Sequence, residues 1–164
     1  MNADFQNHRI EGYARAAQER GLPAKFSVPL ISQIEDTLWQ GGCRDGLQVP
    51  EHITFVLSLY PWERYSISEK QTLKEVKMYD EGALPSLAQL HSLAELVNTM
   101  RDKGETVLVH CQAGLNRSGL VSALSLIKRG MKPTEAIAKL RSSRCDMVLC
   151  NDTFENYLLS LKNT

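Results

Sequence analysis

The stretch Thr106-Val107-Leu108-Val109-His110-Cys111-Gln112-Ala113-Gly114-Leu115-Asn116-Arg117-Ser118-Gly119 decides the fold expected for the whole chain. Residues 106–109 are apolar and rich in β-branched side chains, which predicts a buried strand. Apolar residues recur at helical spacing after Gly119, so a helix should begin near Arg117. The loop between them lies at a helix N-terminus, where unpaired N–H groups and the helix dipole favour an anion.

The side chains of this loop suit both the capture of a phosphate and attack on it. Donors that hold an anion also stabilise a thiolate, so Cys111 is expected to ionise readily and act as a nucleophile. Arg117 offers a planar fork to two phosphate oxygens. Ser118 can hydrogen-bond to the sulfur, and His110 can brace the loop from behind. The phosphate would be cradled by Gln112, Ala113, Gly114, Leu115, Asn116 and Arg117.

The loop resembles the Cys-x5-Arg loop of the protein tyrosine phosphatase superfamily, and the short chain is similar to its compact dual-specificity type. Residues 34–42, Ile-x-x-x-Leu-Trp-Gln-Gly-Gly, are similar to the opening hairpin of that family. The C-terminal pattern of the family is matched by Arg141, Arg144, Asn151 and Phe154. The resemblance covers roughly residues 30–160. It implies an α/β single domain with a central, mostly parallel sheet of four to five strands and helices on both faces.

The same resemblance implies a phosphomonoester hydrolase acting on phosphoproteins through a phosphocysteine, with no cofactor and no metal. The substrate would carry phosphotyrosine and also phosphoserine or phosphothreonine. Two alternatives stay open: an RNA 5′-triphosphatase, which also carries Asn before Arg, and a catalytically silent phosphate-binding module. A rhodanese-like loop usually has a shorter Cys-to-Arg spacing. Phosphoinositide phosphatases tend to place lysines in the loop, and this loop has none.

The general acid of the resembled family lies about thirty residues before the nucleophile. Asp80 stands 31 positions before Cys111, after an apolar segment read as a strand, and is therefore the predicted acid. Glu81 is the weaker candidate because the neighbouring position points its side chain elsewhere. Asp102 is read as a solvated charge at a helix end. Nucleophile, arginine and acid together favour an enzyme over a binding module.

Hydrophobic periodicity predicts the other elements. Residues 1–27 are expected to form an N-terminal helix over 8–20 and a segment that leads into the domain. The dual-specificity-phosphatase-like catalytic domain is expected over residues 28–164. The expected strands lie at 28–34, 37–40, 52–59 and 73–79, and the expected helices at 86–103, from 117 onward, 132–142 and 151–159. The aromatic loop at 60–65 should leave the sheet beside the cradle, so Trp62 and Arg64 are candidate substrate-binding residues. Trp39 is read as a core residue.

Composition fits one soluble domain in a reducing, cytoplasmic setting. The 164 residues carry 19 basic and 19 acidic side chains, so phosphate capture must be local, and an RNA partner is disfavoured. No apolar run indicates a membrane span or a signal peptide. The four cysteines show no paired spacing that would indicate zinc. A phosphorylated protein is the expected partner, and the sequence carries no signal for an oligomeric state.

Overall fold

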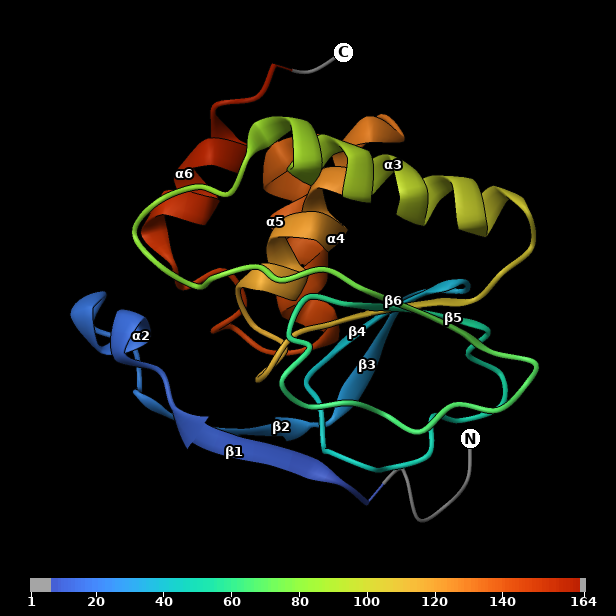
Figure 1. Ribbon diagram of the computed structural model, residues 1–164. Coiled ribbons are helices and arrows are strands. Elements are labelled where there is room, and N and C mark those ends of the chain that lie inside the picture. The colour runs from blue at the N-terminus through green and yellow to red at the C-terminus, as the bar shows by residue number, and fades with distance from the viewer. Residues whose placement is uncertain (1–6, 163–164) are drawn as a thin grey trace.

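A five-stranded sheet in the order β3-β4-β7-β5-β6 organises the computed structural model, which describes residues 7–162 (Figure 1). The strands are β3 Ile31–Glu35, β4 Leu38–Gly41, β5 Phe55–Ser58, β6 Thr72–Glu75 and β7 Val107–His110. β3 and β4 are antiparallel, whereas the pairs β4–β7, β7–β5 and β5–β6 are parallel. The predicted α/β domain with a mostly parallel sheet is therefore confirmed.

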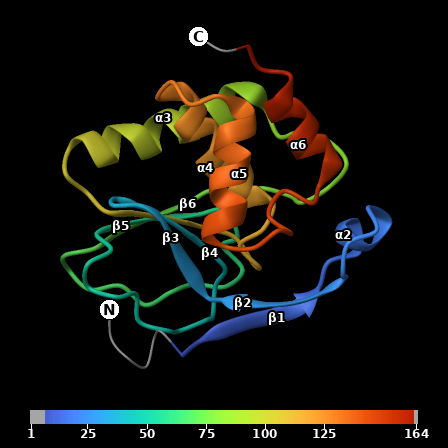
Figure 2. The ribbon, with the colours of Figure 1, turned by 180° about the vertical axis from the view of Figure 1, so that it is seen from behind.

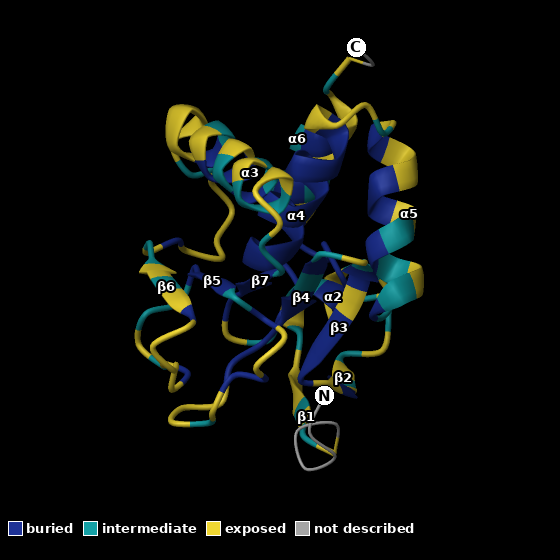
Figure 3. Ribbon diagram, turned by 90° about the vertical axis from the view of Figure 1, so that its right-hand side faces the viewer, coloured by how far each residue is buried: buried dark blue, intermediate teal, exposed yellow. Residues whose placement is uncertain are grey.

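Four helices pack on one face of this sheet (Figures 1 and 2). They are α3 Leu87–Asp102, α4 Arg117–Lys128, α5 Pro133–Ser143 and α6 Asp152–Leu159. α4 lies at the centre of this layer, contacts the other three helices and is buried along nearly its whole length (Figure 3). None of the helices within residues 7–162 is both long and apolar enough to cross a bilayer.

The opposite face of the sheet differs from the expectation that helices cover both faces. There, a second apolar cluster joins Val56 and Leu108 of the sheet to Val49, Ile53 and Tyr65 from the connections on either side of β5. These connections contain no helix, and their own apolar side chains supply the cover that a helix would give. Trp39 packs against this cluster, as predicted for a core residue.

The N-terminal segment corrects the predicted helix over 8–20. β1 Arg9–Tyr13 pairs antiparallel with β2 Lys25–Pro29, and only α2 Arg15–Glu19 between them is helical. The apolar spacing suited a helix, but Gly12 lies opposite Phe26, whose ring would be 2.9 Å from a Cβ at that position. Cross-strand packing therefore overrides the local helical pattern. The predicted boundary between residues 27 and 28 falls inside β2.

The predicted strand over 73–79 is shorter than expected, because β6 ends at Glu75. Asp80 follows in an irregular segment that runs on to α3. The parallel strands nevertheless end at a common edge, where His110 closes β7, Ser58 closes β5 and Gly41 closes β4. Open α/β sheets bind ligands at this edge.

Candidate active site

The loop from Cys111 to Asn116 joins β7 to α4, and hydrogen bonds hold its carbonyl groups on the outside. The carbonyl oxygens of five successive residues, 111 to 115, each accept a bond from a neighbouring segment. The donors are His110 Nδ1 to Cys111 (3.1 Å), Cys43 N to Gln112 (3.1 Å), Arg144 to Ala113 (3.0 Å), Arg144 and Gln40 to Gly114 (2.8 and 3.1 Å), and Leu149 N to Leu115 (3.1 Å).

This arrangement turns the amide groups of the loop inward. In a planar trans peptide the N–H points opposite to the C=O, so the N–H groups of residues 112–116 face the inner side of the loop. Within the described part of the chain, none of these N–H groups donates to a protein acceptor. Five aligned, unpaired donors at the start of α4 form a cradle for an anion such as phosphate.

Two glycines allow the loop to lie this close to the end of β4. Gly114 has a φ of +77°, and a Cβ there would lie 2.4 Å from the carbonyl carbon of Gly41. A Cβ on Gly42 would lie 2.6 Å from the carbonyl oxygen of Gln112. Both positions therefore exclude a side chain, which explains the Gly-Gly pair and the loop glycine in the sequence.

Cys111 opens the loop and lines the large pocket in front of it. Its thiol Sγ donates to the Ser118 Oγ at 3.4 Å, so the two side chains are in contact, with the thiol rather than Ser118 as the donor. Gln40, fully buried in β4, donates to the same hydroxyl oxygen at 3.2 Å as well as to the loop carbonyl. A thiolate has no proton to donate, so with ionised Cys111 the Ser118 hydroxyl can donate to the sulfur instead.

Arg117 is buried at the first position of α4 but still borders the pocket. One guanidinium nitrogen donates to the Met78 carbonyl at 3.2 Å, and the Tyr60 ring lies 5.0 Å from the guanidinium carbon. Within residues 7–162 its Nε has no protein acceptor. The fork is therefore fixed in place with donors left over for a ligand.

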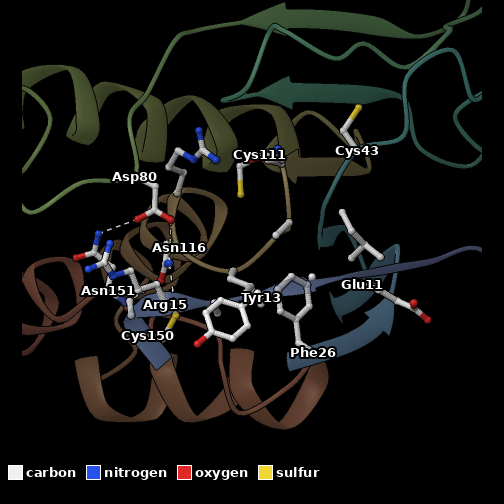
Figure 4. A pocket seen from close by; sticks show the side chains of 18 of the residues that line it. Glu11, Tyr13, Arg15, Phe26, Cys43, Asp80, Cys111, Asn116, Cys150 and Asn151 are labelled. Carbon is white, nitrogen blue, oxygen red and sulfur yellow. Dashed lines mark hydrogen bonds between the residues drawn. The ribbon is translucent and has the colours of Figure 1, made fainter. Parts of the chain in front are cut away.

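Asp80 lies beside Cys111 at the mouth of the cradle, and two asparagines hold its carboxylate (Figure 4). Asn116 Nδ2 donates to one oxygen at 2.9 Å, and Asn151 Nδ2 donates to the other at 2.8 Å. Asn151 N in turn donates to Asn116 Oδ1 at 2.9 Å. The acid candidate is thus tied to the cradle. Glu81 is exposed, and its backbone carbonyl accepts from Asn151 Nδ2 at 2.8 Å.

His110 braces the loop from the core side, where it is completely buried. Its Nδ1–H donates to the Cys111 carbonyl, and the Tyr65 ring meets it edge-on at 5.1 Å between centroids. Burial lowers the pKa of His110 to about 4, so the side chain is neutral at physiological pH.

Two other cysteines, Cys43 and Cys150, line the same pocket. Burial raises the pKa of Cys43 to about 12, and the Glu63 and Asp45 carboxylates add to the effect. Burial also raises the pKa of Cys150. Both groups remain thiols at neutral pH and do not compete as nucleophiles.

The two predicted substrate-binding residues separate in the structure. Trp62 is 49% exposed and lies between the tilted rings of Tyr60 (4.9 Å) and Tyr79 (5.9 Å). It lines a second hollow of 540 Å³ next to Arg117. Arg64 lines neither hollow, because its Nε donates to Glu75 at 2.9 Å. Trp62 is thus beside the cradle, whereas Arg64 belongs to an exposed ion pair.

The main pocket, of 1480 Å³, is walled by more than the predicted residues. One side is formed by the N-terminal segment, residues 7–16, most of which fall in the predicted helix over 8–20. Gln40 and Arg144, which anchor the loop carbonyls, were also given no role from sequence. The signal that the sequence offered for Gln40 is a polar side chain at the end of a strand that is otherwise mostly apolar. Its meaning depends on a loop more than seventy residues away.

Comparison with known proteins places these features in a family. A family model described as the dual specificity phosphatase catalytic domain matches residues 45–164. The tyrosine-protein phosphatase CDC14 of Candida albicans is 33% identical over 82 residues, which are 49% of this chain and 15% of that protein. The protein tyrosine phosphatase PRL-1 of Trypanosoma cruzi is 32% identical over 87 residues, 51% of this chain and 48% of that protein.

The chain therefore spans less than half the length of these two relatives. Among solved structures, human DUSP28 superposes with a TM-score of 0.67 at 18% identity, covering 78% of this chain and 94% of that one. At that identity the likeness concerns the fold.

His110 should make the protein sensitive to acid. Between pH 6.5 and 4 the unfolded chain takes up a proton that the buried imidazole of the folded chain does not. Stability is therefore full above pH 6.5 and falls by about 3 kcal/mol towards pH 4. His110→Asn keeps a donor for the Cys111 carbonyl but does not titrate. In urea unfolding, the free energy of unfolding of the wild type relative to the variant should fall by about 3 kcal/mol between pH 6.5 and pH 4. Parallel pH curves would contradict the assignment.

Proposed function

Because the chain belongs to the dual-specificity phosphatase family, whose members are cysteine-dependent enzymes acting on phosphorylated proteins, we propose that it hydrolyses phosphoprotein monoesters through a phosphocysteine. One observation carries the proposal: the inward-facing amides of residues 112–116, the Cys111 sulfur and the Arg117 fork converge on one pocket beside Asp80. A cytoplasmic setting would keep the thiol reduced.

In the first step the Cys111 thiolate attacks phosphorus. An S–P bond forms while the P–O bond to the substrate breaks. The loop amides and Arg117 bind the non-bridging oxygens, whose charge they stabilise throughout the reaction. Protonated Asp80 gives its proton to the departing oxygen, so that an alcohol or a phenol leaves rather than an anion.

In the second step water attacks the phosphocysteine. Asp80, now a carboxylate, takes a proton from the water, and the S–P bond breaks to release inorganic phosphate. The Ser118 hydroxyl, 3.4 Å from Sγ, can donate to the thiolate that is restored. Asn116 and Asn151 keep the carboxyl group at the cradle through both steps.

The surroundings of the cradle favour a phosphotyrosine without requiring one. Tyr60, Trp62 and Tyr79 form an aromatic wall next to Arg117, and stacking on a phenyl ring is worth about 0.5–1.5 kcal/mol beyond burial. Because this contribution is modest, we also propose phosphoserine and phosphothreonine as substrates. The alternatives, an RNA 5′-triphosphatase or a silent binding module, have less support, since acidic side chains rim the pocket and an acid stands in place.

Replacing the nucleophile separates binding from chemistry. Cys111→Ser should lose essentially all hydrolysis of an aryl phosphate while still binding a phosphopeptide, because the amide cradle is backbone. Cys43→Ser, in the same pocket but not activated, is the matched control and should retain most activity. Substantial turnover by Cys111→Ser would exclude the phosphocysteine route.

Replacing the acid should affect poor leaving groups most. Asp80→Asn is expected to slow phosphopeptide hydrolysis by about 10²–10⁴-fold and activated aryl phosphates much less, because only the former need protonation. Glu81→Gln, one residue along, serves as control and should change neither rate strongly. Equal losses on both substrates in Asp80→Asn would point to a structural role.

The aromatic wall should set the preference between phosphorylated residues. Trp62→Ala is expected to lower kcat/KM for a phosphotyrosine peptide by roughly tenfold at most, and less for the matched phosphothreonine peptide. Ile67→Ala, exposed but outside both hollows, provides the comparison. A phosphoinositide or triphosphate-ended RNA preferred over both peptides would overturn the protein substrate while leaving the Cys111 chemistry intact.

A further inference from the structure

The N-terminal hairpin contributes an edge strand to the wall of the catalytic pocket. Within the described residues β1 pairs with β2 alone. Residues 7–16, which include all of β1, line the pocket, whereas β2 contributes Phe26 only. Figure 4 shows Tyr13 and Phe26 in the same hollow as the Cys111 sulfur. The edge of β1 that lacks a partner strand therefore borders the site of chemistry.

The hydrogen-bond register shows which backbone groups face that open edge. His8 O accepts from Leu30 N at 3.0 Å and Ala14 N donates to Ala24 O at 2.7 Å, in register with the pairs Ile10–Val28 and Gly12–Phe26. Bonded positions alternate along an antiparallel pair, so the even-numbered residues of β1 bond to β2. The N–H and C=O groups of residues 9, 11 and 13 consequently point to the open edge.

One contact locates this edge against the catalytic pocket. The Arg44 guanidinium, itself a pocket residue, donates to the outward carbonyl of Arg9. The outward groups of Glu11 and Tyr13 form no backbone hydrogen bond in the described part of the chain. They supply two donors and two acceptors at strand spacing, a template for one more extended segment.

The hairpin is also fixed relative to the cradle. Arg20, directly after α2, donates to the Leu149 carbonyl at 2.9 Å and forms ion pairs with Glu155 and Asp152 at 3.0 Å each. Leu149 N is the donor that anchors the Leu115 carbonyl of the loop. A segment bound along β1 would therefore lie at a defined distance from Cys111.

The charges around the pocket indicate what kind of segment fits. Apart from Asp80 and Arg117, its lining contains six acidic side chains and three arginines. The acidic ones are Glu11, Glu19, Asp45, Glu63, Glu81 and Asp152. A peptide with basic residues beside its phosphorylated one complements this rim, whereas a polyanion does not.

We propose that the open edge of β1 binds the substrate as an extended phosphopeptide with basic flanking residues, which pairs with Glu11 and Tyr13 as an added strand. The inference rests on the proposed phosphatase function and names the substrate class of that site. Main-chain pairing supplies affinity in this mode, and alternate side chains of the peptide point towards the enzyme. The phosphorylated side chain then enters the cradle, and basic residues two positions to either side, which share its face of the added strand, point towards the acidic rim.

The test is a backbone scan of the substrate. A phosphotyrosine peptide flanked by lysines is made with a single N-methyl group at each successive position and assayed for kcat/KM with the wild-type enzyme. Loss of one backbone hydrogen bond should lower kcat/KM by about 2- to 10-fold, at alternate positions only. The same peptides are titrated against Cys111→Ser, so that the binding pattern is measured without turnover. An effect independent of position, or none, would overturn the added strand.

A variant pair tests the enzyme side. Glu11→Pro removes the outward N–H, and a proline at this position leaves the bonds to β2 intact. Glu11→Ala removes the carboxylate and keeps the N–H. Relative to an aryl phosphate, the peptide kcat/KM should fall about 2- to 10-fold in Glu11→Pro, whereas Glu11→Ala should chiefly weaken the preference for lysine flanks. Equal behaviour of the two variants would contradict backbone pairing.

The controls separate the two levels of the proposal. Thermal unfolding shows whether Glu11→Pro still folds, and the N-methyl scan on wild type decides the question if it does not. Absence of aryl phosphate hydrolysis by the wild type would overturn the phosphatase function itself. Hydrolysis without the alternating pattern would overturn only the docking edge.

Discussion

The site depends on one constraint: the carbonyl groups of a short loop must be bonded from outside so that its amides can face inward. A loop with five N–H groups aligned on one side and without protein acceptors is unfavourable by itself, because the parallel dipoles repel one another and need water or an anion to complete them. The neighbouring segments offset this cost by fixing the carbonyls from Cys111 to Leu115. Binding of an anion is thereby favoured, because the anion accepts hydrogen bonds from the N–H groups that have no protein acceptor.

A small network of hydrogen bonds links the candidate acid, Asp80, to the cradle. The Asn116 side chain donates to Asp80 and accepts from the backbone of Asn151, and Asn151 donates to the other Asp80 oxygen. Three segments distant in sequence thus share one small network, in which the side-chain amides of Asn116 and Asn151 each donate through Nδ2 and accept through Oδ1. A shift of the loop would carry the carboxyl group with it, so that nucleophile and acid stay matched in position.

The sequence predicted those parts of the site that are formed by residues close together in the chain. Cys111, Arg117 and the loop follow from a strand, a turn and a helix that are adjacent in the chain, whereas Asp80 is predicted from the resemblance to a family whose acid lies about thirty residues before the nucleophile. The helix over 8–20 was wrong because Gly12 and Phe26 pair across a hairpin, which no periodicity reports. Arg64 could not be placed from sequence either, since its partner Glu75 lies on β6, the next strand.

Arg144 links the loop after β7 to the N-terminal part of the described chain. Its guanidinium, buried among backbone oxygens, bonds at once to Ala113 and Gly114 of the loop and to Pro29 and Leu30 near the N-terminus. A growing chain on the ribosome thus presents the nucleophile and its arginine well before the residue that shapes their surroundings. The carbonyl groups of Ala113 and Gly114 therefore gain this outside donor only after synthesis has passed residue 144.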